Sequence, residues 1–187
     1  MITVVSGLPR SGTSLMMQML DAGGLPVLVD ERRGADADNP RGYFEFEKVK
    51  SLKKDNSWLS LAEGKAVKIV SLLLYDLPTG FDYQVIFMQR DLDEVLRSQE
   101  TMLARQGADP GNNRAAMRGH FEKHLTHLNQ WLEKRERLKV HFCDYRRLVE
   151  QPVETAGQIA NFLQMKIDQA AMASVVDRNL YRQRSES

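Results

Sequence analysis

The apolar residues of the chain fall into short β-branched runs that alternate with longer segments of helical spacing. The short runs predict strands at 2–6, 66–70, 84–88 and 139–142. The longer segments predict helices at 11–22, 44–58, 91–105, 114–137, 153–163 and 169–176. Runs such as 66–70 and 84–88 lack a clean polar and apolar alternation, which is typical of strands covered on both faces.

Strands that alternate with helices indicate a mostly parallel sheet wrapped by helices. We expect a three-layer α/β/α sandwich with about four to five strands. The polar, Gly- and Pro-containing segments 30–42 and 106–113 predict loops. A length of 187 residues without a repeat or a linker predicts one domain spanning residues 1–187.

Composition narrows the functional classes. The 26 basic and 25 acidic residues give a net charge of +1, which argues against a bulk basic field for nucleic acid or a membrane surface. No apolar run reaches the ~20 residues needed to span a bilayer. Cys143 is the only cysteine, so an intramolecular disulfide is excluded and a reducing, cytoplasmic location is expected.

The segment Gly7–Ser14 lies between the first predicted strand and the first predicted helix. Its two glycines stand five residues apart, which lets the backbone wrap an anion with N–H groups pointing inward. The helix N-terminus adds the positive end of its dipole. Thr13 and Ser14 supply hydroxyl donors, and Arg10 supplies a full positive charge. This P-loop arrangement predicts the binding of a phosphorylated nucleotide.

The same loop lacks the lysine of a nucleoside-triphosphatase P-loop. Thr13 occupies the position of that lysine, and the cation stands instead at Arg10. Such a loop is poorly equipped for a γ-phosphate with nearly two negative charges, whereas a sulfonate carries only one. One arginine and backbone donors would then suffice, and no metal is expected.

Two motifs of the chain resemble those of the sulfotransferases that use 3′-phosphoadenosine 5′-phosphosulfate (PAPS). The segment Pro9–Ser14 is similar to their P-[KR]-S-G-T-[ST] loop. The second motif is a strand that ends in Arg90, with Ser98 eight residues later on the following helix. The segments 39–45 and 144–149 are also similar to those of the family.

The resemblance implies a P-loop fold similar to that of the nucleoside triphosphatases, with PAPS as co-substrate. Residues Arg10, Ser11, Gly12, Thr13 and Ser14 would hold the 5′-phosphosulfate. Arg90 and Ser98 would hold the 3′-phosphate. The product would be a sulfonated hydroxyl or amine on a small-molecule, carbohydrate or lipid acceptor.

The chain departs from the family pattern in three places. Asp91 and Leu92 replace a common Asn-Pro after the arginine of the second motif. The basic C-terminal loop of the cytosolic branch is missing, and Arg178, Arg182 and Arg184 are the cations available in its place. The chain is also short, so its acceptor pocket is expected to be small, open, or completed by another subunit of a homo-oligomer.

The expected catalytic residues are Arg10, Glu45 and Lys68. Arg10 would stabilise charge on the transferring group. The stretch 68–71 has no histidine where the cytosolic branch has its base. Other branches of the family use a glutamate from the loop region after the first helix, and this resemblance makes Glu45 the leading base and Glu47 the second. Lys68 lies in an apolar strand and either points its ammonium at the sulfonate or is an ordinary strand-edge lysine.

Other polar and aromatic residues are assigned to ordinary structural roles. His120, His124 and His127 share one helix face at a spacing that suits a metal, but a solvated face is the preferred interpretation. Cys143 is expected to pack at the end of the last strand. Two other functions stay open, namely a P-loop nucleotide or small-molecule kinase and a non-catalytic nucleotide-binding module.

Overall fold

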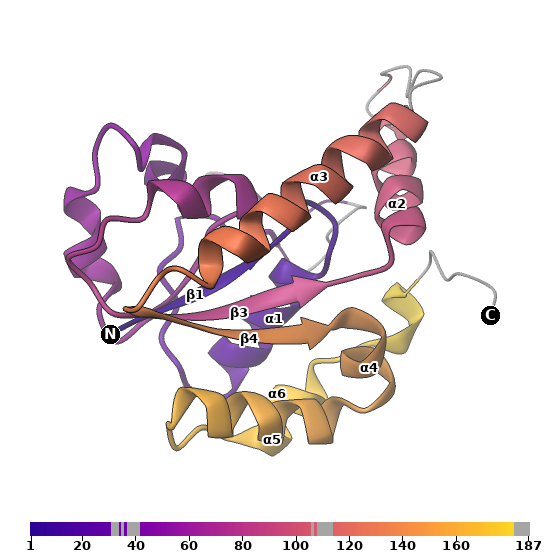
Figure 1. Cartoon of the computed structure of the whole chain (residues 1–187). Coiled ribbons are helices and arrows are strands. Elements are labelled where there is room, and N and C mark those ends of the chain that lie inside the picture. The colour runs from indigo at the N-terminus through magenta and orange to yellow at the C-terminus, as the bar shows by residue number, and fades with distance from the viewer. Residues whose placement is uncertain (31–33, 35, 37–41, 106, 108–113, 182–187) are drawn as a thin grey trace.

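A computed structural model describes residues 1–30, 34, 36, 42–105, 107 and 114–181. The predicted loops at 30–42 and 106–113 lie mostly outside these residues. The described part is an α/β structure in which a sheet is flanked by helices on both faces (Figure 1). Within this part, no helix is long and apolar enough to cross a membrane.

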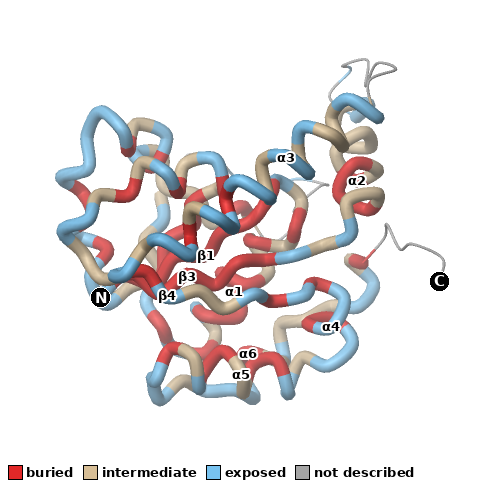
Figure 2. The backbone as a smooth tube through the Cα atoms, viewed as in Figure 1, coloured by how far each residue is buried: buried red, intermediate tan, exposed pale blue. Residues whose placement is uncertain are grey.

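The sheet contains four parallel strands among the described residues. They are β1 (Ile2–Gly7), β2 (Ala66–Lys68), β3 (Tyr83–Gln89) and β4 (Leu138–Asp144), in the order β2-β1-β3-β4. The predicted parallel sheet of four to five strands is therefore confirmed. β1 and β3 are buried along almost their whole length, which explains why their sequences do not alternate (Figure 2).

Two hydrophobic clusters cover the two faces of the sheet. On one face, α1 (Thr13–Ala22), α4 (Tyr145–Glu150), α5 (Pro152–Leu163) and α6 (Gln169–Ser174) contribute to the first cluster. On the other face, α3 (Arg114–Leu132) packs with three 3₁₀ helices. These are η1 (Glu47–Ser51), η2 (Ser57–Ala62) and η3 (Ser71–Asp76).

The strand order places a topological switch point at β1. The chain passes from β1 to β2 on one side of it and then to β3 on the other side. Ligands of open α/β sheets bind at the carboxyl ends of strands at such a point. Two segments leave this edge, the loop after Gly7 and, after β3, the helix α2 (Leu92–Arg105).

The predicted helix over 44–58 is wrong. The structure has η1 and the start of η2 there, because polar turns interrupt the helical spacing. The Asp55 carboxylate accepts hydrogen bonds from the backbone N–H and the hydroxyl of Ser57. Phe44 also has a positive φ of 53°, which a helix does not allow.

Other segments also differ from the sequence prediction. Helix α3 ends at Leu132, and turns at 131–135 lead into β4. The segment 145–150, for which no helix was predicted, forms the helix α4, whose first turn is capped by the Asp144 carboxylate. Strand β2 is only three residues long.

Candidate active site

The loop from Gly7 to Ser14 requires glycine at both of its glycine positions. A Cβ on Gly7 would lie 2.8 Å from the carbonyl oxygen of Met88 on the neighbouring strand. A Cβ on Gly12 would lie 2.3 Å from the ring of Tyr145, and the φ of Gly12 is 99°. The loop is therefore pressed against β3 and α4, and only glycine permits that approach.

Some polar groups of this loop donate hydrogen bonds to nearby carbonyl groups, and others are backbone amides in the first turn of α1. The Ser11 hydroxyl is buried and donates to the Leu8 carbonyl at 2.7 Å, which fixes the turn. The Ser14 hydroxyl donates to the Tyr43 carbonyl at 3.2 Å. Gly12, the N-cap residue of α1, has no side chain that could cap the helix. The first-turn amides of α1, which have no intrahelical acceptor, therefore remain suited to an anion.

The two motifs singled out in the sequence meet at the carboxyl edge of the sheet. Arg10 of the loop donates from Nε to the Ser98 hydroxyl of α2 at 3.0 Å, across 88 positions of the sequence. Arg90 follows β3 and donates from Nη1 to the carbonyl oxygen of Arg10 at 3.0 Å. The tertiary structure thus brings both Arg90 and Ser98 into direct contact with Arg10.

Arg90 is part of a buried cluster that could be predicted only in part from the sequence. Its Nε lies 2.9 Å from the Glu94 carboxylate, and both side chains are nearly inaccessible, with 8% and 2% of their surface exposed. The rings of Tyr145 and Tyr181 lie against its guanidinium. The four-residue spacing of Arg90 and Glu94 was a visible signal for the ion pair, whereas nothing in the sequence pointed to Tyr181.

Glu45 and Lys68 also come together, from a loop and from the end of β2. The Lys68 ammonium lies 3.3 Å from the Glu45 carboxylate, and it donates to the carbonyl oxygen of Tyr43. It also lies 3.5 Å from the Ser14 hydroxyl, at the end of the loop from Gly7 to Ser14. Lys68 is buried, although β2 is an edge strand of the sheet. Glu45 keeps 28% of its side chain exposed and remains accessible.

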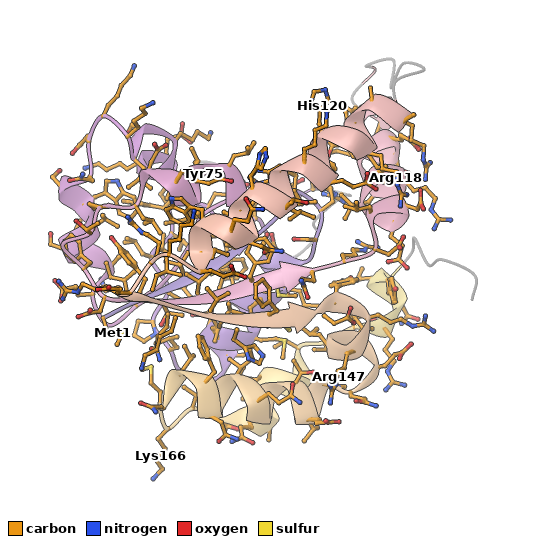
Figure 3. All side chains as sticks on the ribbon, viewed as in Figure 1. Met1, Tyr75, Arg118, His120, Arg147 and Lys166 are labelled. Carbon is orange, nitrogen blue, oxygen red and sulfur yellow. The ribbon has the colours of Figure 1, made fainter. Side chains whose placement is uncertain are left out.

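The histidines of α3 differ from one another. His120 and His127 are exposed as expected, and His120 projects outward from the helix in Figure 3. His124 contradicts the predicted solvated face, because its Nε2 lies 2.9 Å from the buried Ser71 hydroxyl. Burial lowers the pKa of His124, and electrostatic repulsion from His127 lowers it further. No group of three metal-ligating side chains is found among the described residues.

Several other residues have structural surroundings, and some motif residues lie outside the described part. Trp58 and Tyr43 are buried, and Phe46 packs edge-on against Trp58. Cys143 is buried at the end of β4 as expected, and burial raises the pKa of its thiol to about 12. Arg178 donates to the carbonyl oxygen of Glu150. The motif residues 39–41, together with Arg182 and Arg184, lie outside the described residues.

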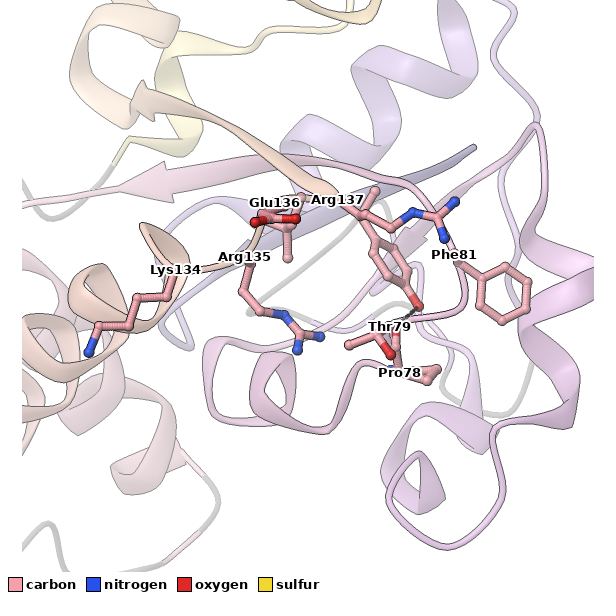
Figure 4. Close-up of a pocket in the computed structure, with 9 residues that line it drawn as sticks. Pro78, Thr79, Phe81, Lys134, Arg135, Glu136 and Arg137 are labelled. Carbon is pink, nitrogen blue, oxygen red and sulfur yellow. Dashed lines mark hydrogen bonds between the residues drawn. The ribbon is translucent and has the colours of Figure 1, made fainter.

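A surface pocket of about 250 Å³ lies at the opposite, amino edge of the sheet (Figure 4). Its lining comes from the turn before β3 and from residues 134–138. Arg137 forms a bidentate pair with Asp82 there, and both side chains are half exposed. None of the sequence-predicted site residues lines this pocket, so we place the candidate site at the carboxyl edge, where buried polar groups converge.

Comparison with known proteins shows the family of the chain. A family model described as the sulfotransferase domain matches residues 2–186. A solved structure, the sulfotransferase domain from the curacin biosynthetic pathway, superposes with a TM-score of 0.56 at 16% sequence identity. The match covers 96% of this chain and 88% of that structure, and it supports the same fold. A search of curated protein sequences finds no match. The chain therefore belongs to the sulfotransferase domain family and is a sulfotransferase.

Proposed function

We propose that this sulfotransferase uses PAPS as its donor and sulfonates a hydroxyl or amine of a small-molecule acceptor, with carbohydrates and lipids included. We also propose that residues 1–187 act as one sulfotransferase domain. The buried single cysteine, Cys143, suits a reducing compartment such as the cytoplasm.

One observation carries the proposal, the hydrogen bond between Arg10 and Ser98. PAPS has anionic groups at both the 5′ and the 3′ positions of one nucleoside. A site for it needs two anion-binding groups within the span of a single nucleotide. The phosphate loop and the Arg90/Ser98 motif touch each other, so their separation suits one such ligand.

The residues at this edge fit the donor chemically. The glycine-lined loop and the first-turn amides of α1 form a cradle for the 5′-phosphosulfate, with Arg10, Ser11, Gly12, Thr13 and Ser14 around it. Arg90 and Ser98 stand where the 3′-phosphate would bind. The donor, when bound, supplies the sulfonate group that is transferred.

The chain's own residues then divide the remaining tasks. Arg10 places positive charge where negative charge develops during transfer. The buried Lys68 ammonium, held by the Tyr43 carbonyl beside the loop, adds a second cation on the same side. The accessible carboxylate of Glu45 accepts the acceptor's proton, and its pairing with Lys68 fixes its position.

Thermal unfolding with nucleotides tests the donor assignment. We expect 3′-phosphoadenosine 5′-phosphate, without Mg²⁺, to raise the melting temperature by roughly 5–10 °C at 100 times its Kd. ATP with Mg²⁺ should have little effect, because Thr13 replaces the P-loop lysine. A clear preference for Mg·ATP would instead favour the kinase alternative.

Turnover assays separate the enzyme from a non-catalytic module. Transfer of labelled sulfonate from PAPS should be detected in a screen of hydroxyl and amine acceptors. Tight nucleotide binding with neither transfer nor slow PAPS hydrolysis would identify a binding module that has lost catalysis.

A further inference from the structure

The guanidinium of Arg90 is enclosed by two tyrosines that come from separate parts of the chain. Its central carbon lies 4.5 Å from the ring centroid of Tyr145 at the start of α4. It lies 5.4 Å from the ring centroid of Tyr181, which follows the short 3₁₀ helix η4 (Arg178–Leu180). The two rings meet edge to face, with centroids 5.2 Å apart. Both tyrosines are buried, so the rings restrict the directions in which the guanidinium can point.

Tyr181 also acts on the carboxylate that holds Arg90. Its hydroxyl donates to Glu94 Oε1 at 2.7 Å, while Glu94 Oε2 accepts from Arg90 Nε. Each oxygen of the buried carboxylate therefore has a donor. The hydroxyl draws part of the Glu94 charge away from Arg90, which leaves more of the arginine's positive field for an anion.

Tyr145 links the same guanidinium to the phosphate loop. One edge of its ring lies where a Cβ of Gly12 would be, so the ring and the loop backbone are in close contact. One tyrosine therefore touches both the loop that faces the 5′ end of the proposed donor and the arginine that faces its 3′ end. Its ring fixes the distance between these two anion-binding groups.

We propose that Tyr145 and Tyr181 are positioning residues that orient Arg90 for the 3′-phosphate, with Glu94 as the shared anchor. This proposal rests on the proposed PAPS function and adds a source of nucleotide specificity. Pre-orientation matters because an arginine side chain otherwise loses rotamer freedom when the phosphate binds.

The test compares the affinities of two nucleotides, 3′-phosphoadenosine 5′-phosphate and adenosine 5′-phosphate, by titration calorimetry. Their ratio measures the contribution of the 3′-phosphate alone. In Tyr181→Ala we expect the ratio to fall about tenfold, while the affinity for adenosine 5′-phosphate stays within about twofold. In Tyr181→Phe, which keeps the ring but removes the donor to Glu94, we expect a fall of about threefold.

Tyr83→Phe is the matched control. Tyr83 is also buried, and its hydroxyl donates to the Pro78 carbonyl at 3.1 Å, but it lies at the amino edge of the sheet. Its ratio should equal that of the wild type. If Tyr181→Ala does not fold, Tyr181→Phe decides the question, since it preserves the packing of the ring.

The outcomes separate this proposal from the proposed function. A wild-type preference for the 3′-phosphate that both Tyr181 variants retain overturns the positioning role alone. An equal loss of affinity for both nucleotides also overturns it, because that pattern indicates a merely structural role. A wild type without any preference for the 3′-phosphate overturns the donor assignment, and the positioning role with it.

Discussion

The two edges of the sheet both carry arginines, carboxylates and tyrosines, yet only one has the properties of a site. At the carboxyl edge, the Arg90–Glu94 pair is almost completely buried, and Arg10 donates a hydrogen bond to Ser98. At the amino edge, the Arg137–Asp82 pair is half exposed beside an open pocket. The two pairs differ in burial. Water screens the exposed pair, whereas the buried pair has lost its hydration and needs specific hydrogen-bond partners in the protein.

A surface pocket lined by basic residues is therefore a weaker indicator of function than a cluster of buried polar groups. The amino-edge pocket lies where β3 and β4 begin, away from the switch point of the sheet. The carboxyl edge combines the switch point, two glycine-dependent close approaches and two arginines. Paired substitutions at the two edges test this contrast.

The largest expected difference is in turnover. Glu45→Gln should lower kcat by roughly 10²–10⁴-fold, because the amide cannot accept the acceptor's proton, while nucleotide affinity stays nearly unchanged. Glu136→Gln, at the amino-edge pocket, should leave kcat unaltered. Steady-state sulfonate transfer and nucleotide titration measure both. Retained turnover in Glu45→Gln would point to Glu47 or to another base.

The second difference is in stability. Arg90→Met leaves the buried Glu94 carboxylate without its cation, and we expect the free energy of unfolding to fall by roughly 3–5 kcal/mol. Arg137→Met removes an exposed partner of Asp82 and should not shift the urea midpoint measurably. Equal midpoints for the two variants would mean that burial does not distinguish the two edges.

A smaller effect is expected from glycine substitution. Gly12→Ala forces a side chain into the left-handed region and against the Tyr145 ring, at a cost of roughly 1–3 kcal/mol. Gly80→Ala, in the turn before β3, meets no atom within 4 Å. Circular dichroism melting should show a lower transition only for Gly12→Ala, with weaker nucleotide binding. An unchanged melting point for Gly12→Ala would argue against the close packing of loop and ring.

The smallest effect concerns alkaline pH. Burial raises the pKa of Tyr83 to about 12 in the folded protein, from an ordinary value of 10.0. The unfolded chain therefore ionises first, and stability falls as the pH rises from about 10 to about 12. Urea titrations at pH 9 and pH 11 should show a smaller loss in Tyr83→Phe than in the wild type. An identical loss in both would assign the alkaline destabilisation to other groups.

Much of the fold and of the candidate site could be read from the sequence. β-branched runs predicted the strands, and a glycine pair between strand and helix predicted the phosphate loop. Arg10 was identified as the cation of that loop from its residue type and position, whereas Arg90 and Ser98 were identified by their resemblance to the second motif of the sulfotransferase family. The segment 44–58 was misread as a helix, because apolar spacing alone does not reveal the Asp55–Ser57 turn or the positive φ of Phe44.

The sequence by itself determined the parallel α/β architecture and the residue types that can hold an anion, because both follow from periodicity and from local backbone geometry. Only the tertiary structure decided which side chains meet. It paired Lys68 with Glu45, His124 with Ser71, and Tyr181 with Glu94. These contacts join residues 23, 53 and 87 positions apart, so they depend on how whole elements pack on the sheet rather than on any local pattern.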